Sequence, residues 1–207
     1  HSTALYSGLV PGVVAGLYAP SEAAIDLRQL CLRAGVMFMQ AEITGLNLPA
    51  LELQLEGRPP LRCDRLSLDL GAVTASVPGK ATGERAVKPL EPFLAWVAAR
   101  PSGQPLRIRG GGAAAVELAL AFRARGASVE LLLRGEGLQL GSPAANRRGA
   151  AMLAAAEVRL HPYASAEASA DLSCTGSRAP QWLAASGLPV DPSSGRVLTE
   201  PTLAVQG

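Results

Sequence analysis

The chain has 207 residues, which is enough for one or two domains with a real hydrophobic core. Hydrophobic residues make up 48% of the chain and charged residues only 17%, so the composition excludes a largely disordered protein. The formal net charge of +2 and the aromatic content of 4% provide neither a basic field for phosphates nor stacking platforms for bases. We therefore expect no nucleic acid as a partner.

The early part of the chain mixes loop-like and periodic segments. Residues 5–16 combine Gly, Pro and apolar residues without a regular period, which predicts a packed loop or a short broken helix. Residues 21–34 predict a helix with Ser21 as its N-cap, ended by Gly35. The apolar run at 36–39 then predicts a short buried strand.

Two strictly alternating runs follow, at 51–56 and 65–70, with a turn at 57–60. They predict a hairpin or meander that leads into a strand ending at Gly71. Prolines and glycines are frequent from 72 to 105, around one apolar helical piece at 92–99, so we expect a connection between domains there.

A glycine-rich motif stands between two strand-like runs. Residues 106–109 predict a short strand, Gly110, Gly111 and Gly112 follow, and residues 113–122 predict an Ala- and Leu-rich helix. A second strand is predicted at 128–133. Strand, glycine turn, helix and strand within about 30 residues is the arrangement that places a pyrophosphate at a helix N-terminus. The spacing Gly-x-Gly-x-x-Ala makes Ala115 the small residue for close helix–strand packing.

The end of the second strand bears on the choice of nucleotide. An NAD site should have Asp or Glu there to accept the ribose hydroxyls, whereas this strand ends in Leu133 followed by Arg134. Two interpretations stay open. Arg134 pairs with a 2′-phosphate and favours NADPH, or Glu136 is the acceptor, displaced by two residues. Arg109, directly before the glycines in a normally apolar strand, is a second unusual feature.

Three motifs resemble those of one flavoprotein superfamily, and they occur in its order. Asp64–Gly71 resembles the D-x-L-x-x-A-T-G strand at which the chain leaves an FAD-binding domain, and Val77–Gly79 resembles the I-P-G after it. Gly110–Ala119 resembles the turn of the inserted NAD domain. Ala170–Gly176 resembles the A-D-x-x-x-x-T-G strand that returns to the FAD domain. The chain is thus similar to the FAD/NAD(P)-binding pyridine nucleotide–disulfide oxidoreductase superfamily.

Within this superfamily, residues 6–12 and Val87–Pro89 are similar to the branch near type II NADH dehydrogenases and sulfide:quinone reductases, including forms fused to selenophosphate synthetase. The resemblance implies an α/β protein with the two-dinucleotide-binding-domain flavoprotein fold, in which a Rossmann-like NAD(P) domain is inserted in a partial FAD domain. The expected divisions are a partial FAD domain at 1–90, a connection at 91–104, the NAD(P) domain at 105–180 and a return to the FAD domain at 181–207.

The resemblance also implies an activity and its cofactors. The expected function is that of an NAD(P)H-dependent FAD oxidoreductase, which passes hydride from nicotinamide to flavin and electrons on to a quinone or another small acceptor. The family's N-terminal FAD motif and its C-terminal G-D segment have no counterpart between His1 and Gly207. The chain is therefore expected to be an interior fragment that holds FAD poorly, and is inactive, when purified alone.

Residue roles follow from the same resemblance. Gly110, Gly112 and Ala115 would hold the NAD(P) pyrophosphate, while Gly71 and Gly176 would let the backbone pass close to a cofactor. For the chemistry itself, the resemblance implies two candidates. Glu117 would lie near the nicotinamide–flavin junction, and Lys88 at the flavin edge, although Lys88 is equally typical of a solvated side chain.

Other features predict location and partners. Cys31, Cys63 and Cys174 form neither a CxxC pair nor zinc-ligand spacing, so we expect no metal site, and the sparse set favours a cytoplasmic protein. Residues 147–160 form an amphipathic segment that could touch the inner face of a membrane, or simply be a solvated face. A second class of function also stays open, that of a non-catalytic module for nucleotide sensing or for contact with a fused or partner enzyme.

Overall fold

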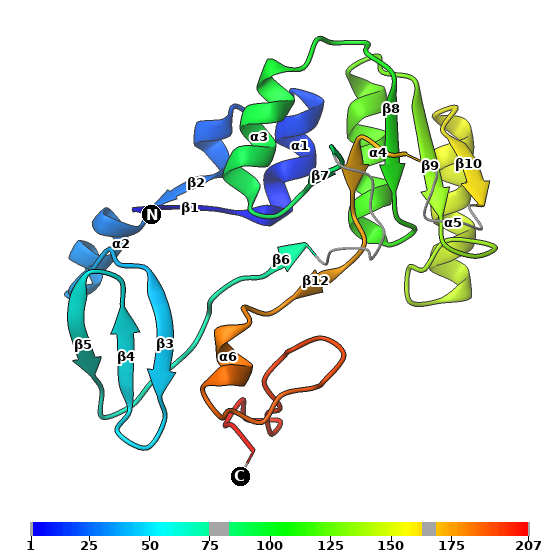
Figure 1. The fold of residues 1–207 in the computed structure, drawn as a ribbon. Helices are drawn as coiled ribbons and strands as arrows, with labels where there is room; N and C mark the ends of the chain where they lie inside the picture. Colours follow the sequence, from blue (N-terminus) through cyan, green and yellow to red (C-terminus); the bar gives the residue numbers. More distant parts are fainter. Residues whose placement is uncertain (1, 75–82, 163–168, 207) are drawn as a thin grey trace. The chain divides into compact units, whose positions relative to one another are not determined.

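The computed structural model describes residues 2–74, 83–162 and 169–206, and divides the chain into two compact units (Figure 1). The first unit consists of Asp26–Val73 and Ser177–Gly207 together with the first three residues. The second consists of Ala4–Ile25 and Thr74–Gly176. Most of the second unit is therefore inserted between the two main segments of the first.

A parallel sheet forms the centre of the second unit. Its strands, in spatial order, are β10 (Arg159–Pro162), β9 (Val129–Leu133), β8 (Leu106–Arg109), β11 (Leu172–Ser173) and β7 (Arg85–Ala86). Each adjacent pair is parallel, and Leu106 lies opposite Val129 while Leu172 lies opposite Ile108. The carboxyl ends of all these strands therefore point to one edge of the sheet.

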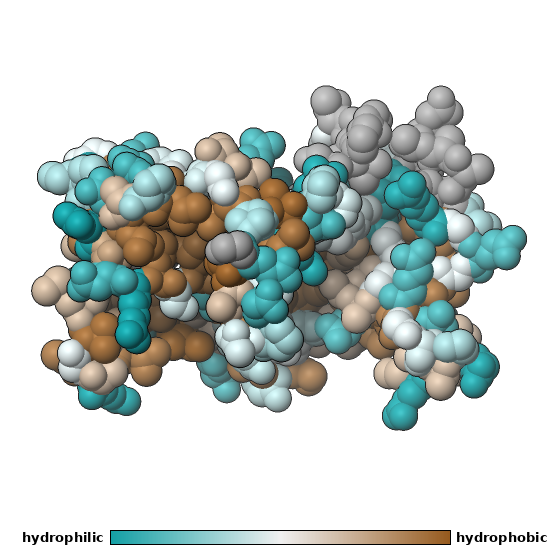
Figure 2. Space-filling view, turned by 90° about the horizontal axis from the view of Figure 1, so that it is seen from below, coloured by the Kyte–Doolittle hydropathy of each residue, from teal (hydrophilic) through white to brown (hydrophobic). Residues whose placement is uncertain are grey.

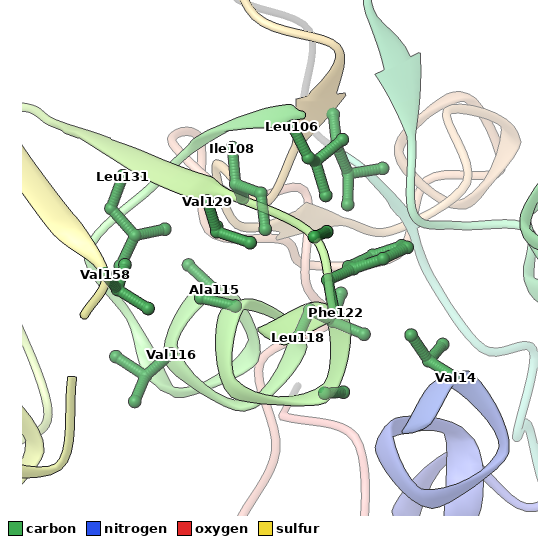
Figure 3. Close-up of a cluster of buried hydrophobic side chains, with 14 of the residues drawn as sticks. Val14, Leu106, Ile108, Ala115, Val116, Leu118, Phe122, Val129, Leu131 and Val158 are labelled. Atoms are coloured by element: carbon green, nitrogen blue, oxygen red, sulfur yellow. The ribbon is translucent and has the colours of Figure 1, made fainter. Parts of the chain in front are cut away.

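Helices pack against this sheet in one hydrophobic core. They are α1 (Val10–Ala15), α3 (Leu90–Ala99), α4 (Ala113–Ala124) and α5 (Pro143–Ala155). Figure 3 shows α4 beneath β8 and β9, with Ile108 and Leu131 pointing toward it. Phe122 on α4 is 2% exposed and Leu153 on α5 is completely buried. Small alanines on α4 let the helix approach the strands closely.

The first unit is smaller and built on antiparallel strands. It contains α2 (Leu27–Ala34), β3 (Ile43–Asn47), β4 (Glu52–Leu55), β5 (Arg58–Arg62) and the short helix α6 (Trp182–Ala185). Leu46, Leu53, Leu183 and Leu188 are the buried residues of its core. The Leu46 backbone N–H donates to Ser186 Oγ at 3.2 Å, which ties β3 to the segment after α6.

Short elements complete the chain. The strands β1 (Thr3–Leu5) and β2 (Ala24–Asp26) form one two-stranded sheet, and β6 (Val73–Thr74) and β12 (Ser177–Arg178) form another. Two 3₁₀ turns, η1 (Ser7–Leu9) and η2 (Pro20–Ala23), precede and follow α1. No helix among the described residues is long and apolar enough to cross a membrane.

Two of the predicted strands do not form. Residues 36–39 and 65–70 pair with no other described strand, and Met37 is 86% exposed. Their sequence patterns suit a strand, but a strand also needs a neighbour that supplies backbone hydrogen bonds. Val36, Met37 and Met39 consequently reach the surface, whereas Leu66, Leu68 and Leu70 pack, partly buried, against the core of the first unit. Figure 2 shows hydrophobic residues gathered on the face that it draws.

Two element boundaries were also predicted wrongly. The helix expected from Ser21 begins instead at Leu27, because the Asp26 carboxylate accepts the Gln29 N–H and caps it, and Ser21 lies in the 3₁₀ turn before β2. The turn expected at 57–60 is tighter, since Gly57 adopts a φ of +62° and β5 already begins at Arg58. Its two prolines are tolerated because β5 is an edge strand.

Candidate functional site

The three consecutive glycines lie between a parallel strand and the start of a helix, as the sequence predicts. Strand β8 ends at Arg109 and α4 begins at Ala113, with Gly112 as its N-cap. The turn therefore lies at the carboxyl edge of the parallel sheet, where open α/β sheets bind ligands.

Gly110 is required by the fold itself. Its φ of +140° is rarely adopted by residues with a side chain. A Cβ added there would lie 2.7 Å from the carbonyl oxygen of Cys174, at the end of the neighbouring strand β11. The Cys174 N–H donates to the Arg109 carbonyl oxygen at 2.8 Å, which keeps these two strand ends together. Gly110 thus makes the tight turn assigned to it and lets β11 approach.

Gly111 faces the loop that follows β9. A Cβ on Gly111 would lie 3.3 Å from Leu133 Cδ2 and 3.4 Å from the carbonyl oxygen of Gly137. The Gly111 carbonyl oxygen accepts the Gln139 N–H at 2.8 Å, and Leu138 is buried. The glycine turn and the loop after β9 are therefore joined directly.

Gly112 differs from the two glycines before it. Its backbone lies at φ −85° and ψ 178°, which any residue can adopt, and a Cβ would meet nothing nearer than the Gln139 carbonyl oxygen at 4.0 Å. No side chain caps the N-terminus of α4 at this residue. The first N–H groups of a helix have no intrahelical acceptor, and the helix dipole favours an anion there. Protein packing therefore leaves open space beside the helix start.

Arg134 and Glu136 lie in the loop between β9 and α5. Both side chains are exposed, and Gly135 between them adopts a φ of +98°. This loop starts at the last residue of β9 and is held further on by the hydrogen bond from Gln139 to Gly111. The structure thus brings the two candidate ribose-binding residues to the same sheet edge as the glycine turn.

Beneath the turn lies a buried ion pair that the sequence pattern did not identify. Arg109 Nε lies 3.0 Å from Glu84 Oε1, and their side chains are 1% and 0% exposed. Burial, and to a lesser degree the Glu84 carboxylate, raises the pKa of the Cys174 thiol to about 12. An arginine directly before the glycines was the only sign of this pair, because Glu84 lies 25 residues earlier in the chain.

The remaining predicted site residues do not belong to the glycine turn. Glu117 is exposed on α4, four residues after its start. Lys88 is partly buried, and its backbone N–H donates to Thr74 Oγ1 at 2.9 Å. Gly71 and Gly176 adopt φ values of +68° and +92° in the two chain segments that cross between the units. The Val77–Gly79 motif lies outside the described residues.

Comparison with known proteins finds the same architecture in solved structures of reductases and oxidases. No family model matches the sequence, and no curated protein does. Solved structures do match. Reduced CoADR-RHD from Bacillus anthracis has a TM-score of 0.77 at 13% identity, over 97% of this chain and 42% of that one.

Two related oxidases match as well. The water-forming NADH oxidase from Lactobacillus brevis, bound to NADH, has a TM-score of 0.73 at 17% identity, over 94% of this chain and 50% of that one. An engineered NADPH oxidase made from it, bound to NADPH, has a TM-score of 0.77 at 16% identity, over 95% and 50%.

The chain has the fold of these oxidoreductases. The predicted α/β class and two-dinucleotide-binding-domain flavoprotein fold are therefore confirmed. The chain spans about half the length of the structures that it matches.

Proposed function

We propose that this chain is the dinucleotide-binding part of an NAD(P)H-dependent flavin oxidoreductase. The observation that carries the proposal is the open space at Gly112. Gly110 and Gly111 are explained by close contacts within the protein, whereas Gly112 has no packing reason to lack a side chain. A backbone that must approach a pyrophosphate supplies such a reason.

The residues at the turn suit a nicotinamide dinucleotide. The first N–H groups of α4 would donate hydrogen bonds to the pyrophosphate beside Gly112, and buried Ala115 lets the helix pack close to the sheet. The Arg109–Glu84 pair places one positive and one negative charge beneath the turn, so the positive charge of Arg109 compensates the negative charge of Glu84 there. The loop after β9 would receive the adenosine ribose.

The flavin half of the proposal rests on the resemblance of residues 64–71 and 170–176 to the strands at which such a chain leaves and re-enters an FAD-binding domain. We assign Gly71 and Gly176 to the close passage of backbone past FAD, Glu117 to the region of the nicotinamide–flavin junction, and Lys88 to the flavin edge. When bound, nicotinamide and flavin supply the hydride transfer, and the electrons leave to a quinone or another small acceptor. The protein's part is to hold the two groups and exclude competing reactions.

Binding measurements on the 207-residue chain test the proposal. We expect NADH or NADPH to bind with a dissociation constant in the micromolar range by isothermal titration calorimetry. A Gly112→Ala variant should bind at least about tenfold more weakly while unfolding at the same temperature, because its methyl group enters the space left for the pyrophosphate.

Gly45→Ala is the matched control, since Gly45 lies in β3 of the first unit and an added Cβ would make only ordinary contacts with Gln54 at 3.6 Å. This variant should bind nucleotide like the unchanged chain. A folded sample that binds neither nucleotide would refute the proposal and favour a partner-contact module that keeps only the fold.

A further inference from the structure

We infer that the dinucleotide site prefers NADPH to NADH, and that Arg134 is the residue that determines this preference. The inference rests on the proposed function and concerns the same site. It starts from the end of β9, where a carboxylate would accept hydrogen bonds from the ribose hydroxyls of NADH and an arginine would donate hydrogen bonds to the 2′-phosphate of NADPH.

No carboxylate occupies the end of this strand. Leu133 is the last residue of β9, and it is 3% exposed, with its Cδ2 packed toward the glycine turn. An apolar, buried side chain cannot accept a hydrogen bond from a ribose hydroxyl. The feature that favours NADH is therefore missing at the strand end.

The residue directly after β9 is an arginine, Arg134. Arg134 is exposed, so its side chain is available to a ligand at the carboxyl edge of the sheet. A 2′-phosphate carries close to two negative charges, and the planar guanidinium can donate two parallel hydrogen bonds to it. NADH offers only a neutral hydroxyl at that position, which gains much less from the same group.

The two matching oxidases carry the comparison further. The enzyme bound to NADPH differs from its NADH-bound parent by five substitutions. The first replaces a glycine by alanine. Eighteen positions later an aspartate is replaced by alanine, and the residue after it, an alanine, is replaced by arginine. In this chain Ala115 is followed eighteen positions later by Leu133, and then by Arg134.

Three features of the NADPH-bound oxidase thus recur here at the same spacing: a small alanine, an apolar residue without a carboxylate, and an arginine after it. The other two substitutions introduce serine at the next position and arginine five positions further on. This chain has Gly135 and Leu140 at those spacings, so Arg134 would supply the 2′-phosphate contact without the second arginine.

Glu136 is the competing acceptor. It lies two residues beyond Arg134, and the backbone between them turns at Gly135 with a φ of +98°. If Glu136 held the ribose hydroxyls, NADH would bind more tightly than NADPH, because a carboxylate repels a phosphate dianion. The two interpretations therefore differ in the sign of the preference.

The test is a set of titrations with four ligands, in low-salt buffer so that phosphate contacts are not screened. They are NADPH, NADH, and the fragments 2′,5′-ADP and AMP, which differ only by the 2′-phosphate. We expect NADPH and 2′,5′-ADP to bind about tenfold to a hundredfold more tightly than NADH and AMP. Arg134→Ala should abolish this ratio by weakening NADPH and 2′,5′-ADP far more than NADH and AMP.

Arg33→Ala is the matched control, because Arg33 is an exposed arginine on α2 in the first unit and its loss changes net charge equally. It should preserve the ratio. Tighter binding of NADH, or weakening of NADH by Glu136→Gln, overturns the assignment to Arg134 but leaves dinucleotide binding intact. Failure of all four ligands to bind overturns both this inference and the proposed function.

Discussion

Breaking the buried pair between Arg109 and Glu84 should destabilise the second unit more than breaking the exposed pair on the same strand. Removing one partner of a buried pair leaves an uncompensated charge in a medium of low polarity, which costs about 3–5 kcal/mol. The 1% and 0% exposure of these side chains places the pair fully in that category. Glu84→Gln, which preserves the volume of the side chain, should therefore lower the melting temperature by roughly 6–20 °C.

Arg107 provides the comparison. It lies two residues earlier on β8, and its Nε lies 3.1 Å from Glu130 Oε2, but its side chain is 55% exposed. Water and salt screen such a pair, so Arg107→Met should cost no more than about 1 kcal/mol. The two ion pairs have nearly the same length, and burial alone separates their expected contributions.

Intrinsic fluorescence can follow the second unit selectively. Of the two tryptophans, Trp96 on α3 packs near Phe93 and Phe122 in the core of that unit, and Trp182 belongs to the first unit. Urea unfolding in a Trp182→Phe background would therefore report on Trp96 alone.

A double-mutant cycle completes the experiment. Glu84→Gln, Arg109→Met and the combined variant should show a coupling energy of about 2 kcal/mol or more, because the two charged groups lie 3.0 Å apart and both side chains are buried. Costs that simply add, or a Glu84→Gln variant that loses less than about 1 kcal/mol, would show that the pair is not the stabilising feature inferred from its burial.

Further predictions concern the turn, a thiol and the C-terminal segment. Gly110→Ala should destabilise the second unit by at least about 1–3 kcal/mol in the same urea assay, because φ of +140° strains a residue with a side chain and the new methyl meets the Cys174 carbonyl oxygen; stability equal to that of the unchanged chain would refute this. The raised pKa of Cys174, about 12 instead of 9.0, leaves about a thousandfold less thiolate at pH 8. Alkylation followed by peptide mapping should therefore find Cys174 labelled quickly only after unfolding, and rapid labelling of the folded chain would count against its burial. Hydrogen bonds from Ser193 and Ser194 lower the pKa of Asp191 from 3.8 to about 2, so these contacts stabilise the segment above pH 4 and are lost as the pH falls through 2. A titration of the Ser194 amide by NMR with a midpoint near 4 would contradict this.

The sequence predicted correctly those parts of the fold whose signals all lie within one short stretch of the chain. Strand β8, the three glycines, helix α4 and strand β9 follow one another within 30 residues, and each boundary carries its own chemical reason. The helix expected at 92–99 is found as α3, from Leu90 to Ala99. In these segments the spacing of the apolar residues and the residues at each end indicate the same helix or strand.

The parts that could not be predicted depend on partners distant in sequence. Residues 36–39 and 65–70 have strand-like patterns, yet an alternating sequence only makes a segment suitable for a sheet, and hydrogen bonding to a neighbour decides whether it joins one.

The candidate site divides in the same way. Local spacing identified the glycine turn, but it treated its three glycines as equal parts of one motif. The structure separates them. An added Cβ would meet Cys174 at Gly110, and Leu133 and the loop after β9 at Gly111, but at Gly112 it would meet nothing nearer than 4.0 Å. A glycine that packing explains says little about function, since any substitution there would already disturb the fold. A glycine whose surroundings have room for a side chain is not explained by packing, and at a helix start on the carboxyl edge of a parallel sheet a close pyrophosphate supplies a reason for it. For this reason Gly112, and not the motif as a whole, connects the fold of this chain to the proposed dinucleotide.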